Sequence, residues 1–131
     1  MKDWAAIPLR LGLGAMFVGH GLQKAFGLFN GPGIEGFKGF MVNLGLPFPT
    51  IMAYAAAYVE LVGGLFLILG LLTKLSATAL LGVMLVAMLK VHFENGFFLM
   101  NGGYEYTLII IVALISLIFS GPGKFCVNRK L

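Results

Sequence analysis

The sequence is poor in cysteine and in charge. Cys126 is the one cysteine of 131 residues, so neither an internal disulfide nor a Cys-x-x-Cys redox pair can form, and no thiol pair carries electrons. Charged residues make up 11% of the chain and hydrophobic residues 60%, whereas soluble globular proteins are about 25% charged. With a mean hydropathy of +0.98, the composition predicts a membrane protein with a single domain over residues 1–131.

Runs of basic residues are also missing. The net charge is +4, but apart from the adjacent Arg129 and Lys130 the lysines and arginines stand singly along the chain. A protein that tracks phosphates needs such bases in clusters, so nucleic acid is not an expected partner. The expected partner is a lipid bilayer, because scattered bases near the ends of spans are typical of residues that face an anionic cytoplasmic leaflet.

Four apolar segments approach the ~20 residues that a membrane helix needs. The first is too long for the ~7 to 15 residue core of a cleaved signal, and no small-residue cleavage site follows, so it is predicted to remain as a span. These segments predict an all-α integral membrane four-helix bundle with antiparallel up-down topology. The predicted spans are residues 7–28, 49–72, 75–92 and 104–120.

The connection between the first two spans, residues 29–48, mixes glycine and proline with large apolar residues. It is predicted to lie partly in the membrane interface, with a short amphipathic helix over residues 34–44. The apolar face of that helix would carry Phe37, Phe40, Met41 and Leu44. Thr73 and Lys74 are predicted to form a tight turn between the second and third spans.

With four spans, the N-terminus, the second connection and the C-terminus lie on one side of the membrane. The positive-inside rule then predicts both termini in the cytoplasm of a multi-pass plasma membrane protein. Arg10 would lie just inside the membrane, where a long side chain can reach out to water. The bases counted on the cytoplasmic side are Lys2, Lys74, Lys124, Arg129 and Lys130, against Lys24, Lys38 and Lys90 on the other.

One carboxylate, Glu60, lies deep within the second span. It follows Pro49 by 11 residues, which places it ~16 Å along a helix, near the middle of a hydrocarbon layer ~30 Å thick. Ionisable groups at that depth are costly unless partnered, and they mark functional sites. Small neighbours at helical spacing, Ala56, Ala57, Gly63 and Gly64, would let other helices approach it closely.

The other polar residues within spans gather toward the outer side. The candidate site comprises Glu60, His20, Lys24, Lys90, His92 and Glu105, with Glu94 close by. Their charges nearly balance, so structural salt bridges are the first alternative. A second is a quinone site in which His20, Lys24 or Lys90 donates to the ring carbonyls and Glu60 or Glu105 relays protons. A third is a proton or small-solute path.

A metal or haem is the fourth alternative. His20 and His92 fall at similar depth, each ~22 to 26 Å from the inner end of its span. Lys24 and Lys90 beside them would repel a dication, and no His-x-x-x-His or Glu-x-x-His spacing occurs. The sequence therefore predicts no metal site and no cofactor motif of its own, and it leaves quinone as the one possible cofactor.

Several motifs in this order resemble the DoxX family of small membrane proteins. They are RLGLGAMFVGHGLQKAFG, VELVGGLFLILGLLTK, AMLKVH, GFF, GGYEY and SGPGK. The resemblance implies four helical spans and a link to quinone-coupled oxidation, as in the membrane subunit of a thiosulfate:quinone oxidoreductase, or to oxidative-stress complexes. Family-typical positions include Arg10, His20, Gly21, Lys24, Glu60, Gly63, Gly64, Gly70, His92, Gly96, Gly103, Glu105, Gly121 and Gly123.

The resemblance implies no catalytic residue, and the sequence departs from the family where residues 124–128 replace a small polar residue and an aspartate. The expected function is that of a membrane subunit, or quinone-contacting component, of an oxidoreductase system with a separate redox partner. Whether the chain is itself an enzyme or forms a homo-oligomer stays open. The alternatives are a proton or small-solute transporter and a structural membrane scaffold.

Overall fold

A computed structural model describes residues 2–127, and this part of the chain is helical without strands. The predicted all-helical fold is confirmed. Arg129 and Lys130, two bases used above for membrane orientation, lie outside the described residues. The α-helices are α1 (Lys2–Phe26), α2 (Gly33–Asn43), α3 (Pro49–Leu69), α4 (Thr73–Ala87) and α5 (Glu105–Ser120); a π-helical turn, η1 (Met88–His92), and two short 3-10 turns, η2 (Phe93–Asn95) and η3 (Leu99–Asn101), join α4 to α5.

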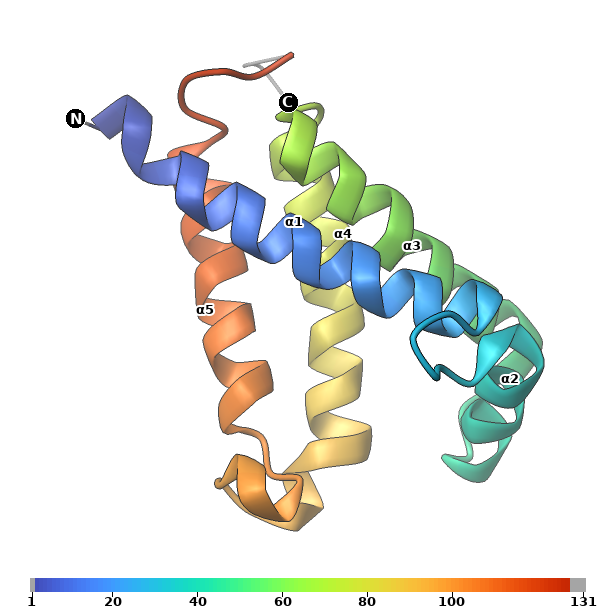
Figure 1. Cartoon of the computed structure of the whole chain (residues 1–131). Coiled ribbons are helices and arrows are strands. Elements are labelled where there is room, and N and C mark those ends of the chain that lie inside the picture. Colours follow the sequence, from blue (N-terminus) through green and yellow to red (C-terminus); the bar gives the residue numbers. More distant parts are fainter. Residues whose placement is uncertain (1, 128–131) are drawn as a thin grey trace.

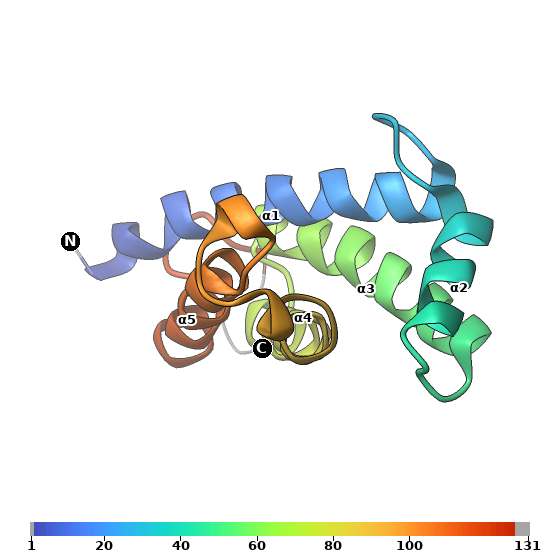
Figure 2. The same ribbon diagram turned by 90° about the horizontal axis from the view of Figure 1, so that it is seen from below.

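The long helices form two antiparallel pairs (Figure 1). Helices α1 and α3 pack side by side, with α2 across the end where they are joined, and α4 lies beside α5. Helix α1 runs obliquely across the second pair; seen from below, it lies lengthwise while α4 and α5 are viewed nearly end-on (Figure 2). The helices therefore do not share one common axis as in a regular up-down bundle.

Three of the helical segments are long and apolar enough to cross a membrane: Asp3–Phe26, Pro49–Leu69 and Thr73–Asn95. Helix α5 is apolar but has 16 residues, a length of ~24 Å. Large apolar side chains are exposed on the outer surfaces of α3, α4 and α5, among them Ile51, Leu75, Ile109 and Phe119. Such surfaces suit contact with lipid chains.

The end of α3 differs from the predicted span. The helix ends at Leu69 because Gly70 adopts a left-handed conformation with φ of +67°, and the amides of Gly70 and Leu71 donate to the carbonyls of Leu67 and Phe66. This bonding pattern is a Schellman motif. The tight turn therefore comprises residues 70–72, and the prediction that Thr73 and Lys74 form it was wrong, since both begin α4.

Glycines bring α1 and α3 into backbone contact. A Cβ atom added to Gly21 would lie 2.6 Å from the Leu61 amide nitrogen, and one added to Gly64 would lie 2.8 Å from the Gly14 carbonyl oxygen. The expected close approach around Glu60 is thus confirmed. Gly12 and Gly19 take no part in it, because an added Cβ would meet nothing within 4 Å.

This contact predicts opposite effects for two neighbouring glycines. Gly21→Ala is expected to lower the free energy of unfolding by about 1 to 3 kcal/mol, because the methyl group must push two backbones apart. Gly19→Ala is expected to be neutral or to stabilise by up to about 1 kcal/mol, because alanine favours the helix. Thermal unfolding of both variants in the same detergent measures the difference, and equal stabilities would contradict the packing.

Helix α2 is amphipathic, as predicted from residues 34–44. Phe37 and Met41 are buried against α3, while Glu35 and Lys38 form an ion pair of 3.0 Å on the outer face. The hydrogen bond that the Lys38 ammonium donates to the Glu35 carboxylate raises the pKa of Lys38 above its ordinary value. The helix therefore presents charge outward and an apolar face toward α3, as an interfacial helix does.

Arg10 is buried, and the expectation that it reaches out to water was wrong. It is 2% exposed, and its guanidinium donates five hydrogen bonds of 2.7 to 3.1 Å, all to backbone carbonyls. Two acceptors, Leu67 and Ile68, lie at the C-terminus of α3, where the carbonyls carry partial negative charge. The others belong to the tail: Pro122, Lys124 and Phe125.

Candidate functional site

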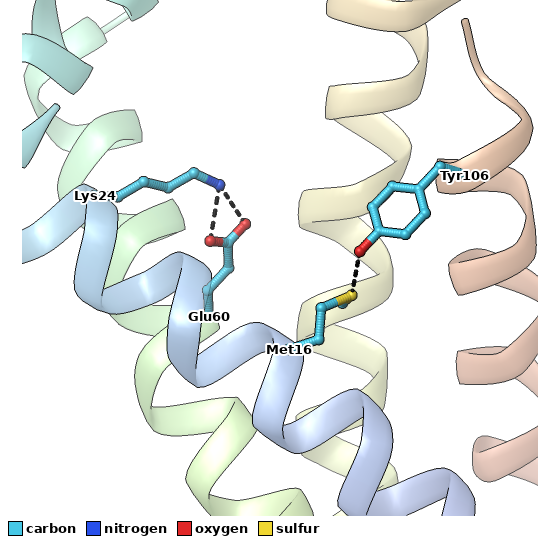
Figure 3. A network of polar contacts seen from close by, with 4 residues as sticks. All are labelled: Met16, Lys24, Glu60 and Tyr106. Carbon is cyan, nitrogen blue, oxygen red and sulfur yellow. Dashed lines mark hydrogen bonds and ion pairs between the residues drawn. The ribbon is translucent and has the colours of Figure 1, made fainter. Parts of the chain in front are cut away.

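The centre of the site is an ion pair between α1 and α3. The Lys24 ammonium donates to both carboxylate oxygens of Glu60, at 2.6 and 2.8 Å (Figure 3). Glu60 is 2% exposed, and the Lys24 side chain is 25% exposed. The close approach of α1 to α3 at Gly21 is what brings the two groups together, since Gly21 precedes Lys24 by less than one turn.

A cavity of about 400 Å³ lies against this ion pair. Its walls come from α2, α3 and α4, and apart from Lys24, Glu60 and His92 they are apolar. Its size falls within the ~300 to 1,000 Å³ range of ligand pockets, which are typically apolar with a few placed polar groups. The apolar walls include Phe37, Phe40, Met41, Met52, Val59 and Val86.

The π-helical turn after α4 decides which residue faces the cavity. A regular helix would place Lys90 and Val91, three and four residues after Ala87, on the cavity face. The wider turn of residues 88–92 adds one residue, so Val91 and His92 line the cavity instead. Lys90 is exposed and lines neither cavity around the pair. Turns of this kind often occur at functional sites.

The neighbouring loop holds the His92 ring. Nδ1 lies 2.9 Å from the Gly102 carbonyl oxygen, and because a carbonyl can only accept, Nδ1 carries the proton. In the neutral ring Nε2 is therefore an acceptor. Lys24 has three donors, of which two contact Glu60. The cavity is therefore lined by one further donor, the third N–H of Lys24, and by one acceptor, Nε2 of His92.

A smaller cavity of about 160 Å³ lies on the α1, α4 and α5 side. It shares Lys24, Glu60 and His92 with the larger cavity, so the ion pair stands between the two. His20, which is exposed, lines it, and so does Tyr106, whose hydroxyl donates to the Met16 sulfur at 2.7 Å (Figure 3). Both histidines therefore face this smaller space. No group of three potential metal ligands occurs within residues 2–127.

The remaining predicted site residues lie elsewhere. The Glu105 carboxylate accepts a hydrogen bond of 2.9 Å from the Leu99 amide and so closes the loop between α4 and α5. Glu94 is exposed in the 3-10 turn before that loop. The structure therefore brings together Lys24, Glu60 and His92, adds His20 on the smaller cavity, and separates Lys90 and Glu105 from them.

Sequence reasoning did not name Tyr106 or any residue of α2 among the site residues, although it expected Phe and Tyr side chains around the outer connections to form apolar walls. A signal was present for α2, because Phe37, Phe40, Met41 and Leu44 share the predicted apolar face and all four line the larger cavity. No local pattern shows that this face covers Glu60.

Comparison with known proteins places this arrangement in a family. The family model described as DoxX matches residues 5–93, more than half of the chain and the part that carries Lys24, Glu60 and His92. The chain belongs to the DoxX family. Together with its long apolar helices, membership establishes a membrane protein. No solved structure matches.

Relatives of this DoxX chain come from several bacteria. It is 31% identical to the "Uncharacterized membrane protein Rv3486" of Mycobacterium tuberculosis, over 97% of this chain and 81% of that protein. It is 34% identical to the "Putative oxidoreductase CatD" of Bacillus subtilis, over 78% and 69% of the two chains. An uncharacterized protein of Haemophilus influenzae is 32% identical, over 94% of this chain and 80% of the relative.

Proposed function

We propose that this DoxX protein is the membrane subunit, or quinone-contacting component, of an oxidoreductase system. The observation that carries the proposal is the apolar cavity of about 400 Å³ with the Lys24–Glu60 pair and His92 as its polar groups. The name of the Bacillus subtilis relative, which describes an oxidoreductase, supports the same class of function.

The polar groups suit both redox forms of a quinone. A quinone carbonyl is an acceptor and matches the third donor of the Lys24 ammonium. A reduced ring carries a hydroxyl donor, which matches the His92 Nε2 acceptor left by the bond to Gly102. The apolar walls, among them Phe37 and Met41, suit the body of the ring.

The proposal includes a membrane topology and a partner. Helix α5, with the apolar connection of residues 96–103, would complete a fourth span, and both termini would lie in the cytoplasm of a plasma membrane protein. Electrons would come from or go to a soluble or membrane redox partner. A homo-oligomer is compatible with the same arrangement.

Removing the ion pair tests the proposal. In the double variant Lys24→Met with Glu60→Gln, the cavity keeps its shape but loses its charged donor. The dissociation constant for menaquinone-4 in detergent is expected to rise about 10- to 100-fold, because a charge-assisted hydrogen bond contributes about 1.5 to 3 kcal/mol. Calorimetric titration measures it.

A matched control removes the same charges from the surface of α2. Glu35→Gln with Lys38→Met deletes an ion pair whose carboxylate is exposed and which lines neither cavity, and it is expected to leave menaquinone-4 binding unchanged. A wild-type protein that binds no menaquinone-4 at saturating concentration would refute the quinone proposal.

The smaller cavity favours a second candidate function. Because it meets the larger cavity at Lys24, Glu60 and His92, the two could form a proton or small-solute path interrupted by the ion pair. Proton or solute flux in liposomes that contain the protein alone would favour transport over quinone contact. A stable complex with a redox protein, without flux or quinone binding, would favour a scaffold.

A further inference from the structure

We infer that the larger cavity opens sideways to the lipid phase between α2 and α4, and that the isoprenoid tail of its ligand leaves the protein past Gly82. This inference rests on the proposed function, since it names the form of quinone that the site takes. The ligand is then a membrane-resident quinone that enters from the bilayer, with its ring at Lys24 and its tail among lipid chains.

The lining of the cavity differs in polarity and in exposure. Its polar lining residues are Lys24, Glu60 and His92, and the Glu60 carboxylate among them is buried. Its apolar lining residues include Phe40 of α2 and Val86 of α4, which are 41% and 38% exposed. The mouth is therefore rimmed by partly exposed apolar side chains from two helices.

The surroundings of this mouth suit lipid and not water. Leu85 of α4 and Leu89 of η1 are exposed, and Ile51 is exposed at the start of α3. A path for a hydrophilic solute would expose polar groups at its entrance, whereas an apolar rim on a membrane protein faces acyl chains. The chemistry of the rim matches a hydrocarbon tail.

Gly82 makes room at the mouth. It lies in α4, it is exposed, it lines the cavity, and a Cβ atom added to it would meet nothing within 4 Å. A larger side chain at this position would therefore extend into open space without disturbing α4, where it also favours the helix. Substitution at Gly82 can obstruct the tail path and leave the polar end intact.

The test compares one tailed and one tail-less quinone. Dissociation constants for menaquinone-4 and for menadione, which has the same ring without the tail, are measured for the wild type, Gly82→Leu and Gly12→Leu. Gly82→Leu is expected to weaken menaquinone-4 binding about tenfold, or about 1.4 kcal/mol, since the leucine side chain would occupy the path of the tail. Menadione binding is expected to change less than about twofold.

Gly12→Leu is the matched control, because Gly12 is also an exposed helical glycine with nothing within 4 Å but lines neither cavity around the ion pair. It is expected to leave both dissociation constants unchanged. Menaquinone-4 binding that survives both Gly82→Leu and Gly82→Trp would overturn the tail path, and so would equal losses for the two quinones. A wild type that binds neither quinone would instead refute the proposed function.

Discussion

Arg10→Met is expected to lower the free energy of unfolding by about 3 to 5 kcal/mol, because a buried cluster of backbone carbonyls loses the guanidinium that donates to it. Five backbone carbonyls from two distant segments converge on the guanidinium. The substitution leaves them without these donors, and it detaches the tail from the C-terminus of α3. Thermal unfolding in detergent measures the loss, and faster tryptic cleavage after Lys124 reports release of the tail.

Arg10→Lys is expected to retain little more stability than Arg10→Met. An ammonium has three donors and no planar fork, so it cannot reach five carbonyls at once. The control is Lys90→Ala, which removes an exposed base from the other end of the molecule and is expected to change stability by less than about 0.5 kcal/mol. Retention of wild-type stability by Arg10→Met would show that the carbonyl cluster does not need the arginine.

Lys24→Met is expected to destabilise the protein by about 3 to 5 kcal/mol, because it leaves the Glu60 carboxylate buried without its partner. Glu60→Gln is expected to cost less. The Glu60 side chain is 3% exposed and the Lys24 side chain 25%, so an unpaired Lys24 can reach solvent or headgroups while an unpaired Glu60 cannot. Unfolding measurements on the two single variants test this asymmetry.

The double variant completes the cycle. Lys24→Met with Glu60→Gln removes both charges and is expected to recover most of the stability lost in Lys24→Met, since no unpaired charge remains. The reference is the pair of Glu35 and Lys38, whose carboxylate is exposed, with an expected coupling free energy of about 0.3 to 0.5 kcal/mol. Additive effects at Lys24 and Glu60 would mean that the two groups do not depend on each other.

The position of the helices and the burial of Glu60 follow from local sequence. Hydrophobic runs and the 3.6-residue period depend on neighbours along the chain, so they predicted α3 from Pro49, the apolar face of α2 and a span over residues 104–120, which α5 (Glu105–Ser120) closely matches. The small residues beside Glu60 predicted a close helix contact. Gly70 also indicates the end of α3, because glycine is common just after a helix. The leucines that follow it extend the hydrophobic run, so the predicted span continued to residue 72.

Which side chains contact one another was decided by tertiary packing. Arg10 meets Pro122 across 112 residues of chain, and no local pattern encodes such a contact. One extra residue in the π-helical turn exchanges Lys90 for His92 at the cavity, because it rotates every later side chain around the helix axis. Lys24 reaches Glu60 because Gly21, which has no side chain, lets the backbones of α1 and α3 come into contact. Composition and periodicity therefore determined where the helices form. The size of the side chains where two helices pack together determined which charged residues come into contact.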